Sequence, residues 1–166
     1  MVLRAFLVSF GIVSGAGFSQ FPEFSQQYLQ RLGGAVDELS TVVSDFDRSA
    51  ATFGMTRHQA LEEMSGSPFL QRRQADLRRT ISRYEELSEA YIALRYAGPF
   101  TRFYEVQHMG DPEILSGTWQ DYRPAVPLTF EGGMFSLFGF LVGYGSLSAL
   151  IKIVRPSRRR NKPTAA

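Results

Sequence analysis

The chain has 166 residues, a formal net charge of +2 and no cysteine. A chain of this length forms one modest domain or a few long helices, and without cysteine it has no disulfides, thiolate catalysis or cysteine-based metal sites. Its charge is segregated: residues 20–127 hold 11 arginines and 15 acidic residues, so their formal charge is −4, whereas residues 152–162 hold six basic residues and no acidic one. The positive charge therefore belongs to the C-terminal tail.

The first segment, residues 1–21, carries Arg4 and then an apolar stretch with Gly11 and Gly15 at GxxxG spacing. Its length suits a transmembrane helix, which requires about 20 residues. A cleaved secretory signal peptide is the alternative, because a charged start, a short apolar core and the small residues Ser14-Gly15-Ala16 are typical of one. We predict an uncleaved span and keep the signal peptide as the alternative.

Residues 22–127 are predicted to form an extramembrane helical domain. Apolar residues from Phe21 to Phe53 recur almost always at steps of three or four, the signature of an amphipathic helix. Gly54 is expected to end this helix. The pair Gly33-Gly34 is a weak point within it, since each glycine costs about 1 kcal/mol relative to alanine.

Two further helices are predicted from their start signals. Thr56 and Gln59 have the spacing of a capping box, and Ser67-Pro68 places an N-cap before a proline at the first helical position. The second of these helices runs as far as Gly98-Pro99. Its apolar stripe matches that of the first long helix, so we expect the two long helices to fold back as an antiparallel hairpin.

Between residues 99 and 127 the pattern weakens. Short helical turns are expected around Phe100–Tyr104 and after Asp111-Pro112. Trp119 and Tyr122 lie shortly before the next apolar segment, where amphipathic rings favour a membrane interface. Packing against the helical hairpin explains the two rings equally well.

The second apolar segment lies in residues 128–154. Its run Gly132–Ile151 has no charged residue and has the length of a transmembrane helix. Small residues recur along one stripe of that helix, where another backbone can approach closely in lipid: Gly132, Ser136, Gly139, Gly143 and Ser146. The partner helix belongs to the same chain or to another one. The opposite side is expected to face lipid through Phe135, Phe138, Leu141, Val142 and Leu150.

The tail, residues 155–166, is basic and is predicted to lie in the cytoplasm, because short flanks rich in positive charge stay on that side of a membrane. Both flanks are positive, so both termini are assigned to the cytoplasm and residues 22–127 to the other side, periplasmic in a bacterium. No contact with nucleic acid is expected there. The tail is expected to bind anionic lipid headgroups, at about 1 kcal/mol per basic residue, through Arg158, Arg159, Arg160 and Lys162. A role in setting the topology alone is the alternative.

No motif predicts catalysis, a cofactor or a metal. No serine lies in a nucleophile motif, and no glycine loop has a phosphate-binding pattern. His58 and Glu62 are four residues apart on a predicted helix and supply two potential metal ligands without a third. We therefore expect neither an enzyme nor a bound metal.

The arginine-rich run from Arg72 to Arg83 is interpreted as a solvated helix face. Asp76 and Arg79 can form an ion pair at i,i+3 spacing, and so can Arg83 and Glu86. Contact of this run with an acidic partner or with lipid headgroups is the alternative.

Polar side chains form one face of the predicted helix directly after the first span. Glutamines are unusual for simple solvation, so we interpret this face as a partner-binding surface, which consists of Gln26, Gln27, Gln30 and Arg31, with Gly33 and Gly34 allowing close backbone approach. A polar face without a partner is the alternative. The stretch PEFSQQYLQRLGGAVDE (Pro22–Glu38) resembles a motif of a proteobacterial family of small two-span membrane proteins of unknown function. This resemblance implies a bacterial inner-membrane protein and no transferable activity.

The sequence thus predicts an all-α membrane protein, with two transmembrane helices flanking an extramembrane antiparallel hairpin. We expect a non-catalytic accessory or scaffold subunit of a bacterial inner-membrane complex, which docks through the small-residue stripe and the glutamine-rich face. Its partners are membrane lipids and another membrane protein or a second copy of the chain. A self-assembling envelope or lipid-organising protein is the alternative.

Overall fold

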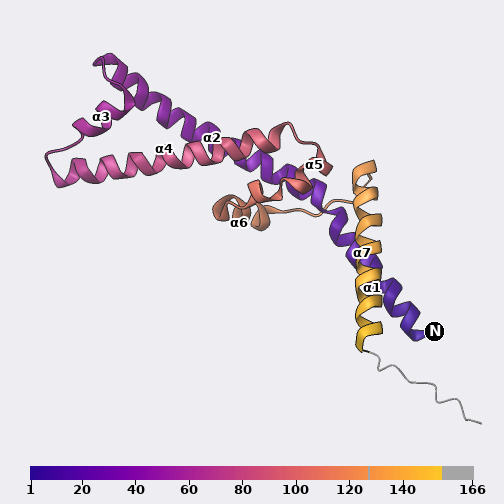
Figure 1. Ribbon diagram of the computed structural model, residues 1–166. Coiled ribbons are helices and arrows are strands. Elements are labelled where there is room, and N and C mark those ends of the chain that lie inside the picture. The colour runs from indigo at the N-terminus through magenta and orange to yellow at the C-terminus, as the bar shows by residue number, and fades with distance from the viewer. Residues whose placement is uncertain (127, 155–166) are drawn as a thin grey trace, which may run out of the picture. The chain divides into compact units, whose positions relative to one another are not determined.

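The computed structural model describes residues 1–126 and 128–154, and within these residues every regular element is a helix (Figure 1). The all-α class is therefore confirmed for the described part of the chain. The chain separates into two units, one made of residues 1–21 with the described residues from Ala125 onward, the other of Pro22–Pro124.

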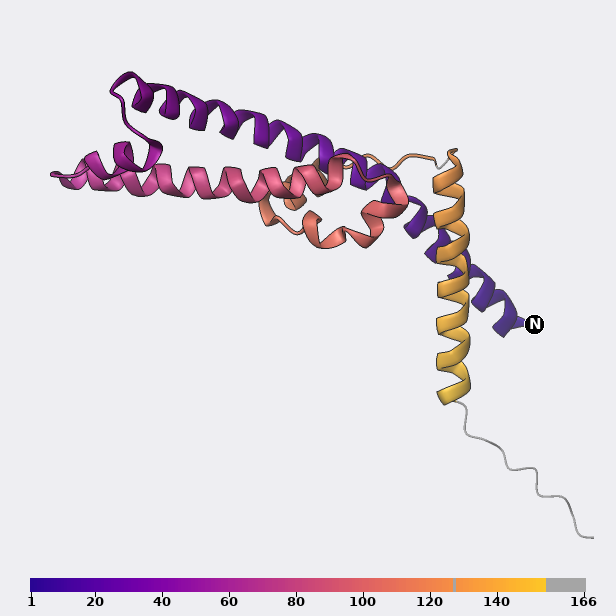
Figure 2. The same ribbon diagram turned by 45° about the horizontal axis from the view of Figure 1, so that its top comes forward.

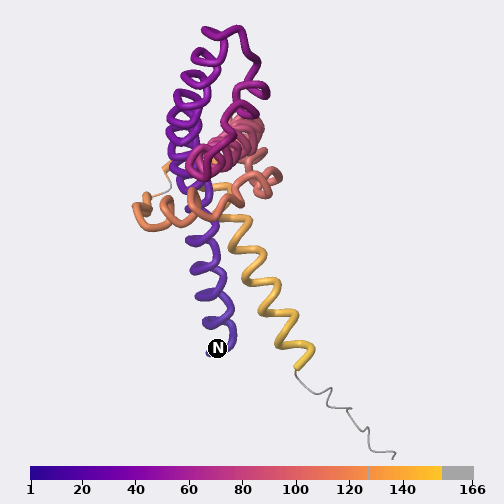
Figure 3. The backbone as a smooth tube through the Cα atoms, turned by 90° about the vertical axis from the view of Figure 1, so that its left-hand side faces the viewer, coloured from indigo at the N-terminus to yellow at the C-terminus, as the bar shows by residue number. Residues whose placement is uncertain are grey.

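The first unit consists of two long helices, α1 (Val2–Ser19) and α7 (Phe130–Val154). With a rise of about 1.5 Å per residue they are about 27 and 37 Å long, and both are long and apolar enough to cross a membrane. They run in opposite directions, as the tube in Figure 3 shows. The same follows from their contacts, because Phe10 lies near Gly143, whereas Phe21 lies near Phe135.

The second unit begins with the predicted long helix, α2 (Phe21–Thr52), which continues through Gly33-Gly34 without a break. Gly33 is buried against the ring of Tyr91, and a Cβ at that position would lie 3.1 Å from the ring. The predicted end is also confirmed: Gly54 has φ +66°, a conformation that side chains disfavour and glycine adopts freely.

The predicted start signals of the next two helices are confirmed. In α3 (Arg57–Glu63), Thr56 and Gln59 form both hydrogen bonds of the capping box. In α4 (Pro68–Arg95), the Ser67 hydroxyl accepts a hydrogen bond from the amide of Leu70 at 3.2 Å. Figure 2 shows α3 between the connected ends of α2 and α4.

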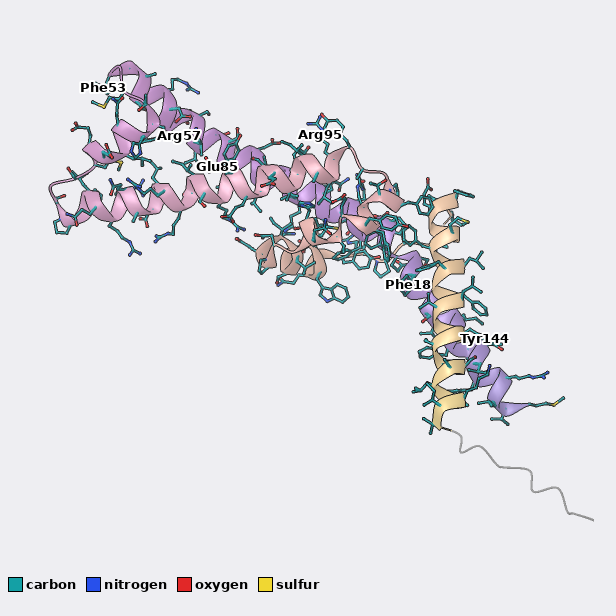
Figure 4. The ribbon with its side chains drawn as sticks, in the orientation of Figure 1. Phe18, Phe53, Arg57, Glu85, Arg95 and Tyr144 are labelled. Atoms are coloured by element: carbon teal, nitrogen blue, oxygen red, sulfur yellow. The ribbon has the colours of Figure 1, made fainter. Side chains whose placement is uncertain are left out.

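Side chains from these three helices form the core of the second unit. Val43, Leu61 and Ile81 are buried together, and partly buried apolar side chains pack against them: Phe46, Met64, Leu77 and Tyr84. Leu32 and Leu94 are also fully buried, so truncating either one to alanine is expected to cost about 2–5 kcal/mol. Polar contacts flank this core, since Arg57 bonds Asp47 at 2.7 and 2.5 Å and approaches Glu85 at 3.6 Å (Figure 4).

Three short helices complete the second unit: α5 (Pro99–Tyr104), the 3₁₀ helix η1 (Val106–Met109) and α6 (Pro112–Asp121). Arg102 of α5 is buried, and its guanidinium donates to the Leu94 carbonyl at 3.2 Å and to the Gln26 Oε1 at 2.8 Å. Burial lowers the pKa of Arg102, because a low-dielectric environment disfavours the charged form. This arginine therefore holds α5 against both long helices.

The start of α6 is held by Asp111, which is its N-cap and also an ion-pair partner. Asp111 Oδ1 accepts a hydrogen bond from the Ile114 amide at 2.9 Å, and the carboxylate binds Arg83 of α4 at 2.9 and 3.2 Å. Burial alone would raise the pKa of Asp111, but the hydrogen bonds from Arg83 and the backbone outweigh this effect and lower the pKa.

We predict that this ion pair makes stability depend on pH in the acid range. The pKa of Asp111 is lower in the folded chain than the unfolded value of about 3.9, so its contribution is complete above that value and is lost as pH falls through the folded pKa. Asp111→Asn keeps an N-cap but loses the charge. It should reduce the free energy of unfolding by about 1–3 kcal/mol at neutral pH, and this difference should shrink below about pH 4.

Urea unfolding of the full chain in detergent, followed by the fluorescence of Trp119 in α6, measures this difference. Glu86→Gln is the matched control, because it removes a carboxylate that also acts on Arg83 but that accepts its hydrogen bond from the exposed Ser82. A difference between wild type and Asp111→Asn that stays constant down to strong acid would contradict the assignment.

Candidate interaction surfaces

The closest packing in the first unit lies where two pairs of glycines meet, which we call the glycine seam: Gly11 and Gly15 of α1 with Gly139 and Gly143 of α7. A Cβ at Gly15 would lie 2.7 Å from the Ser136 carbonyl oxygen, and one at Gly139 would lie 2.8 Å from the Ser14 carbonyl oxygen. Only glycine lets the two backbones come this close. Close packing is a main source of helix association in lipid, where no hydrophobic drive between helices remains.

The structure thus places most of the predicted small-residue stripe against α1 of the same chain. Gly132, Gly139 and Gly143 are buried, and Ser136 touches Gly15 through its backbone. Ser146 lies at the exposed end of the stripe, where its hydroxyl donates to the Gly143 carbonyl at 3.1 Å. A helix of another protein cannot occupy the seam while α1 fills it.

One residue expected on the lipid side of α7 was misplaced. Phe135 is only 4% exposed, because its ring packs against Phe21 with centroids 5.4 Å apart. The stripe of small residues is narrow, so the first unit also covers Phe135, whose large side chain lies next to the stripe on α7. The other four predicted lipid-facing residues are exposed: Phe138, Leu141, Val142 and Leu150.

The predicted glutamine-rich face is largely engaged within the second unit. Gln26 accepts from Arg102, Gln27 donates to Glu23 at 2.8 Å, and Arg31 pairs with Asp121 at 2.6 Å. Gly33 is buried and Gln27 is partly buried, whereas four of the six residues stay exposed: Gln26 and Arg31 beside their bonds, and Gln30 and Gly34. Gln30 is exposed, and a Cβ at Gly34 would meet nothing within 4 Å.

The arginine-rich run of α4 divides into two parts. Asp76 pairs with Arg72 at 3.5 Å and also with Arg79, which confirms the predicted solvated pairing there. Arg83 was expected to pair with Glu86 on its own helix. It instead binds Asp111 and Glu113 of the α6 region. The fold places the Asp111 carboxylate where it accepts two hydrogen bonds from the Arg83 guanidinium.

The histidines give no metal site in the part of the chain that the structure describes. His58 contacts Glu62 at 3.0 Å, and His108 contacts Glu105 at 3.5 Å. Among the described residues, no group of three potential ligands is close enough to hold a metal ion. The four residues predicted to bind lipid headgroups, Arg158, Arg159, Arg160 and Lys162, lie outside the described residues.

One exposed group of large side chains, at the end of α4 and on α5, was not predicted from the sequence. Ile92 and Tyr96 lie one turn apart at the end of α4, and Phe100 and Tyr104 lie one turn apart on α5. All four are exposed, Tyr96 by 81%. We call these four residues the α4–α5 patch. The sequence did contain a signal, because Ile92 and Tyr96 are large side chains that lie off the buried stripe of α4. That stripe includes Ile81, Leu87 and Leu94.

These features define an all-helical protein with two helices that are long and apolar enough to cross a membrane. The family model described as "Protein of unknown function (DUF2937)" matches residues 1–160, so the chain belongs to this family. The expected membership of a family of unknown function is thereby confirmed, whereas the proteobacterial origin and the specific motif stay predictions. No curated protein and no solved structure matches the chain.

We predict that Gly143→Ile separates α1 from α7. A Cβ at this position would lie 2.5 Å from the Cβ and Oγ of Ser14, so the larger side chain forces the helices apart and costs about 1–3 kcal/mol through overpacking. Because the chain has no native cysteine, Phe18→Cys and Phe138→Cys can report the distance through a short thiol cross-linker. Their rings are 5.7 Å apart in the wild type (Figure 4 labels Phe18).

The cross-linking yield should fall several-fold in the Gly143→Ile background. Gly145→Ile is the matched control, because a Cβ there would meet nothing within 4 Å. Equal yields in both backgrounds would show that the seam does not hold the helices together.

Proposed function

We propose that the chain is a non-catalytic accessory subunit of a bacterial inner-membrane complex. In this proposal α1 and α7 cross the membrane, the second unit lies outside the cytoplasm as an α2–α4 helical hairpin, and the α4–α5 patch binds a partner protein there. The observation that carries the proposal is this group of four large, exposed side chains where α4 is followed by α5.

Insertion of the first unit is supported by what its helices expose. Large apolar side chains point outward on both, such as Ile12 and Val13 of α1 and Leu141 of α7. Such a surface is costly in water and favourable in lipid. The seam supports retention of α1 as a span, because a cleaved α1 would leave the buried glycines of α7 uncovered.

Docking through the second unit is supported by the composition of the patch. Two tyrosines, a phenylalanine and an isoleucine lie within thirteen residues of one another on neighbouring helices. Aromatic side chains are enriched in protein interfaces and supply most of the binding energy there. The patch also has a cation beside it, since the guanidinium of Arg95 lies 5.7 Å from the Tyr91 ring centre and 5.6 Å from that of Tyr96.

The outward direction of the second unit is supported by charge. It carries −4 in formal charge, while the basic residues of the chain's ends flank the two apolar helices. Short positive flanks are retained in the cytoplasm, whereas long domains are translocated largely regardless of charge.

We predict that the double variant Tyr96→Ser, Tyr104→Ser loses its partner. Both side chains are exposed, so the fold should be retained, while removal of two aromatic contacts should weaken binding by at least about tenfold. Affinity purification of the full chain in mild detergent, with quantification of each co-purified protein, measures this loss. The matched control is Phe53→Ser, which removes an aromatic ring that is 77% exposed in the turn after α2.

A foreign protein held at fixed stoichiometry by wild type and by Phe53→Ser, but not by the double variant, is the expected result. Equal retention by all three chains would remove the patch from the proposal. Recovery of further copies of the chain and nothing else would favour the self-assembling alternative.

We predict opposite compartments for two reporter positions. A reporter fused after Ala166 should be active only in the cytoplasm, and one inserted at Gly66 only outside it. Gly66 suits insertion, because it is exposed in a turn with φ +91°. Alkaline phosphatase, which is active outside the cytoplasm, and a fluorescent protein, which is active inside it, read the two sides. Cytoplasmic activity at both positions would overturn the proposed topology.

A further inference from the structure

Three aromatic side chains join the beginning of α2 to the end of α6. The ring of Phe24 lies edge-on to Trp119 at 6.0 Å and to Tyr122 at 5.5 Å, and Trp119 stacks on Tyr122 at 6.4 Å. We call these three residues the aromatic anchor. They bring together the two points where the chain enters and leaves the second unit, since Pro22 is its first residue and Pro124 its last.

Packing within the anchor does not account for Trp119. Although its ring touches two others, 71% of this side chain is exposed. Tyr122 is half-buried, and burial together with the nearby charge of Glu23 raises the pKa of its phenol. The sequence allowed two explanations of these rings, a membrane interface or packing on the hairpin. Packing alone leaves the Trp119 ring mostly exposed.

The anchor lies close to both apolar helices along the chain. Phe135 lies three residues inside the charge-free run that begins at Gly132, which corresponds to about 4.5 Å along the helix. Phe21 packs against Phe135, and Phe24 follows three residues later on α2, again about 4.5 Å of rise. Along the chain, Phe24 therefore follows the end of α1 by about one helical turn, and Trp119 and Tyr122 precede the first residue of α7 by eleven and eight residues.

We infer that Trp119 and Tyr122 insert into the boundary between lipid headgroups and acyl chains on the side of the second unit. Indole and phenol rings favour this region, because an apolar ring and a polar N–H or O–H are both satisfied there. Lipid is the occupant that fits an exposed indole only eleven residues before the apolar helix α7. This inference rests on the proposed insertion of α1 and α7.

The experiment uses Trp119 itself, the only tryptophan of the chain. The full chain is reconstituted into vesicles of phosphatidylcholine and phosphatidylglycerol in which one lipid carries bromine, either near the glycerol end or near the methyl end of its acyl chains. Trp119 emission should fall by about twofold with bromine near the glycerol end and less with bromine near the methyl end, as expected for an interfacial indole. Aqueous iodide should quench it weakly.

Two variants in a Trp119→Phe background separate this inference from the proposed insertion. Phe69→Trp places an indole at the start of α4, where the native ring is also 71% exposed; it should be quenched by iodide and not by either lipid. Phe138→Trp places an indole about 9 Å inside the charge-free run, and it should be quenched most by bromine near the methyl end.

Loss of lipid quenching for Trp119, with Phe138→Trp still quenched, would overturn the anchor and leave the insertion standing. This outcome includes the case in which a second copy covers the ring. Loss of lipid quenching at both positions would overturn the insertion and the anchor together.

Discussion

The first unit depends on the contact of two helix backbones in the glycine seam. Where a Cβ at Gly15 or Gly139 would overlap a carbonyl oxygen of the other helix, the absence of side chains is what permits contact. Van der Waals packing of this kind substitutes for the hydrophobic effect when both surroundings are apolar. The seam makes α1 and α7 one unit and leaves most of their large apolar side chains on the outside.

The seam also decides where a partner can bind. Most small residues that the sequence offered as a docking stripe are covered by α1, and three side chains of the glutamine-rich face bond Arg102, Glu23 and Asp121. Internal contacts therefore engage much of the surfaces with the clearest sequence signals. The exposed surface includes the α4–α5 patch, Trp119, and Gln26, Gln30, Arg31 and Gly34 of the glutamine-rich face.

Local chemistry made much of the fold predictable. Thr56 with Gln59, Ser67 with Pro68, and Asp111 with Pro112 each start a helix where the sequence says so, because a cap needs only neighbours within one turn. Contacts between distant elements were not predictable. The partner of Arg83 lies 28 residues further on, and the burial of Phe135 depends on how far α1 overlaps the stripe. The periodic pattern of apolar residues predicts neither the partner of Arg83 nor the extent to which α1 overlaps the stripe.

The hydrogen bonds of Arg102 fix the position of the α4–α5 patch. Arg102 lies between Phe100 and Tyr104 on α5, and two residues on a helix correspond to about 200° of rotation, so the arginine points inward where the aromatic rings point outward. Its guanidinium bonds one oxygen of α4 and one of α2. A buried charge is costly when its bonds are lost, whereas apolar contacts tolerate sliding. Charged hydrogen bonds therefore fix the short helix in one place, and with it the orientation of the exposed rings.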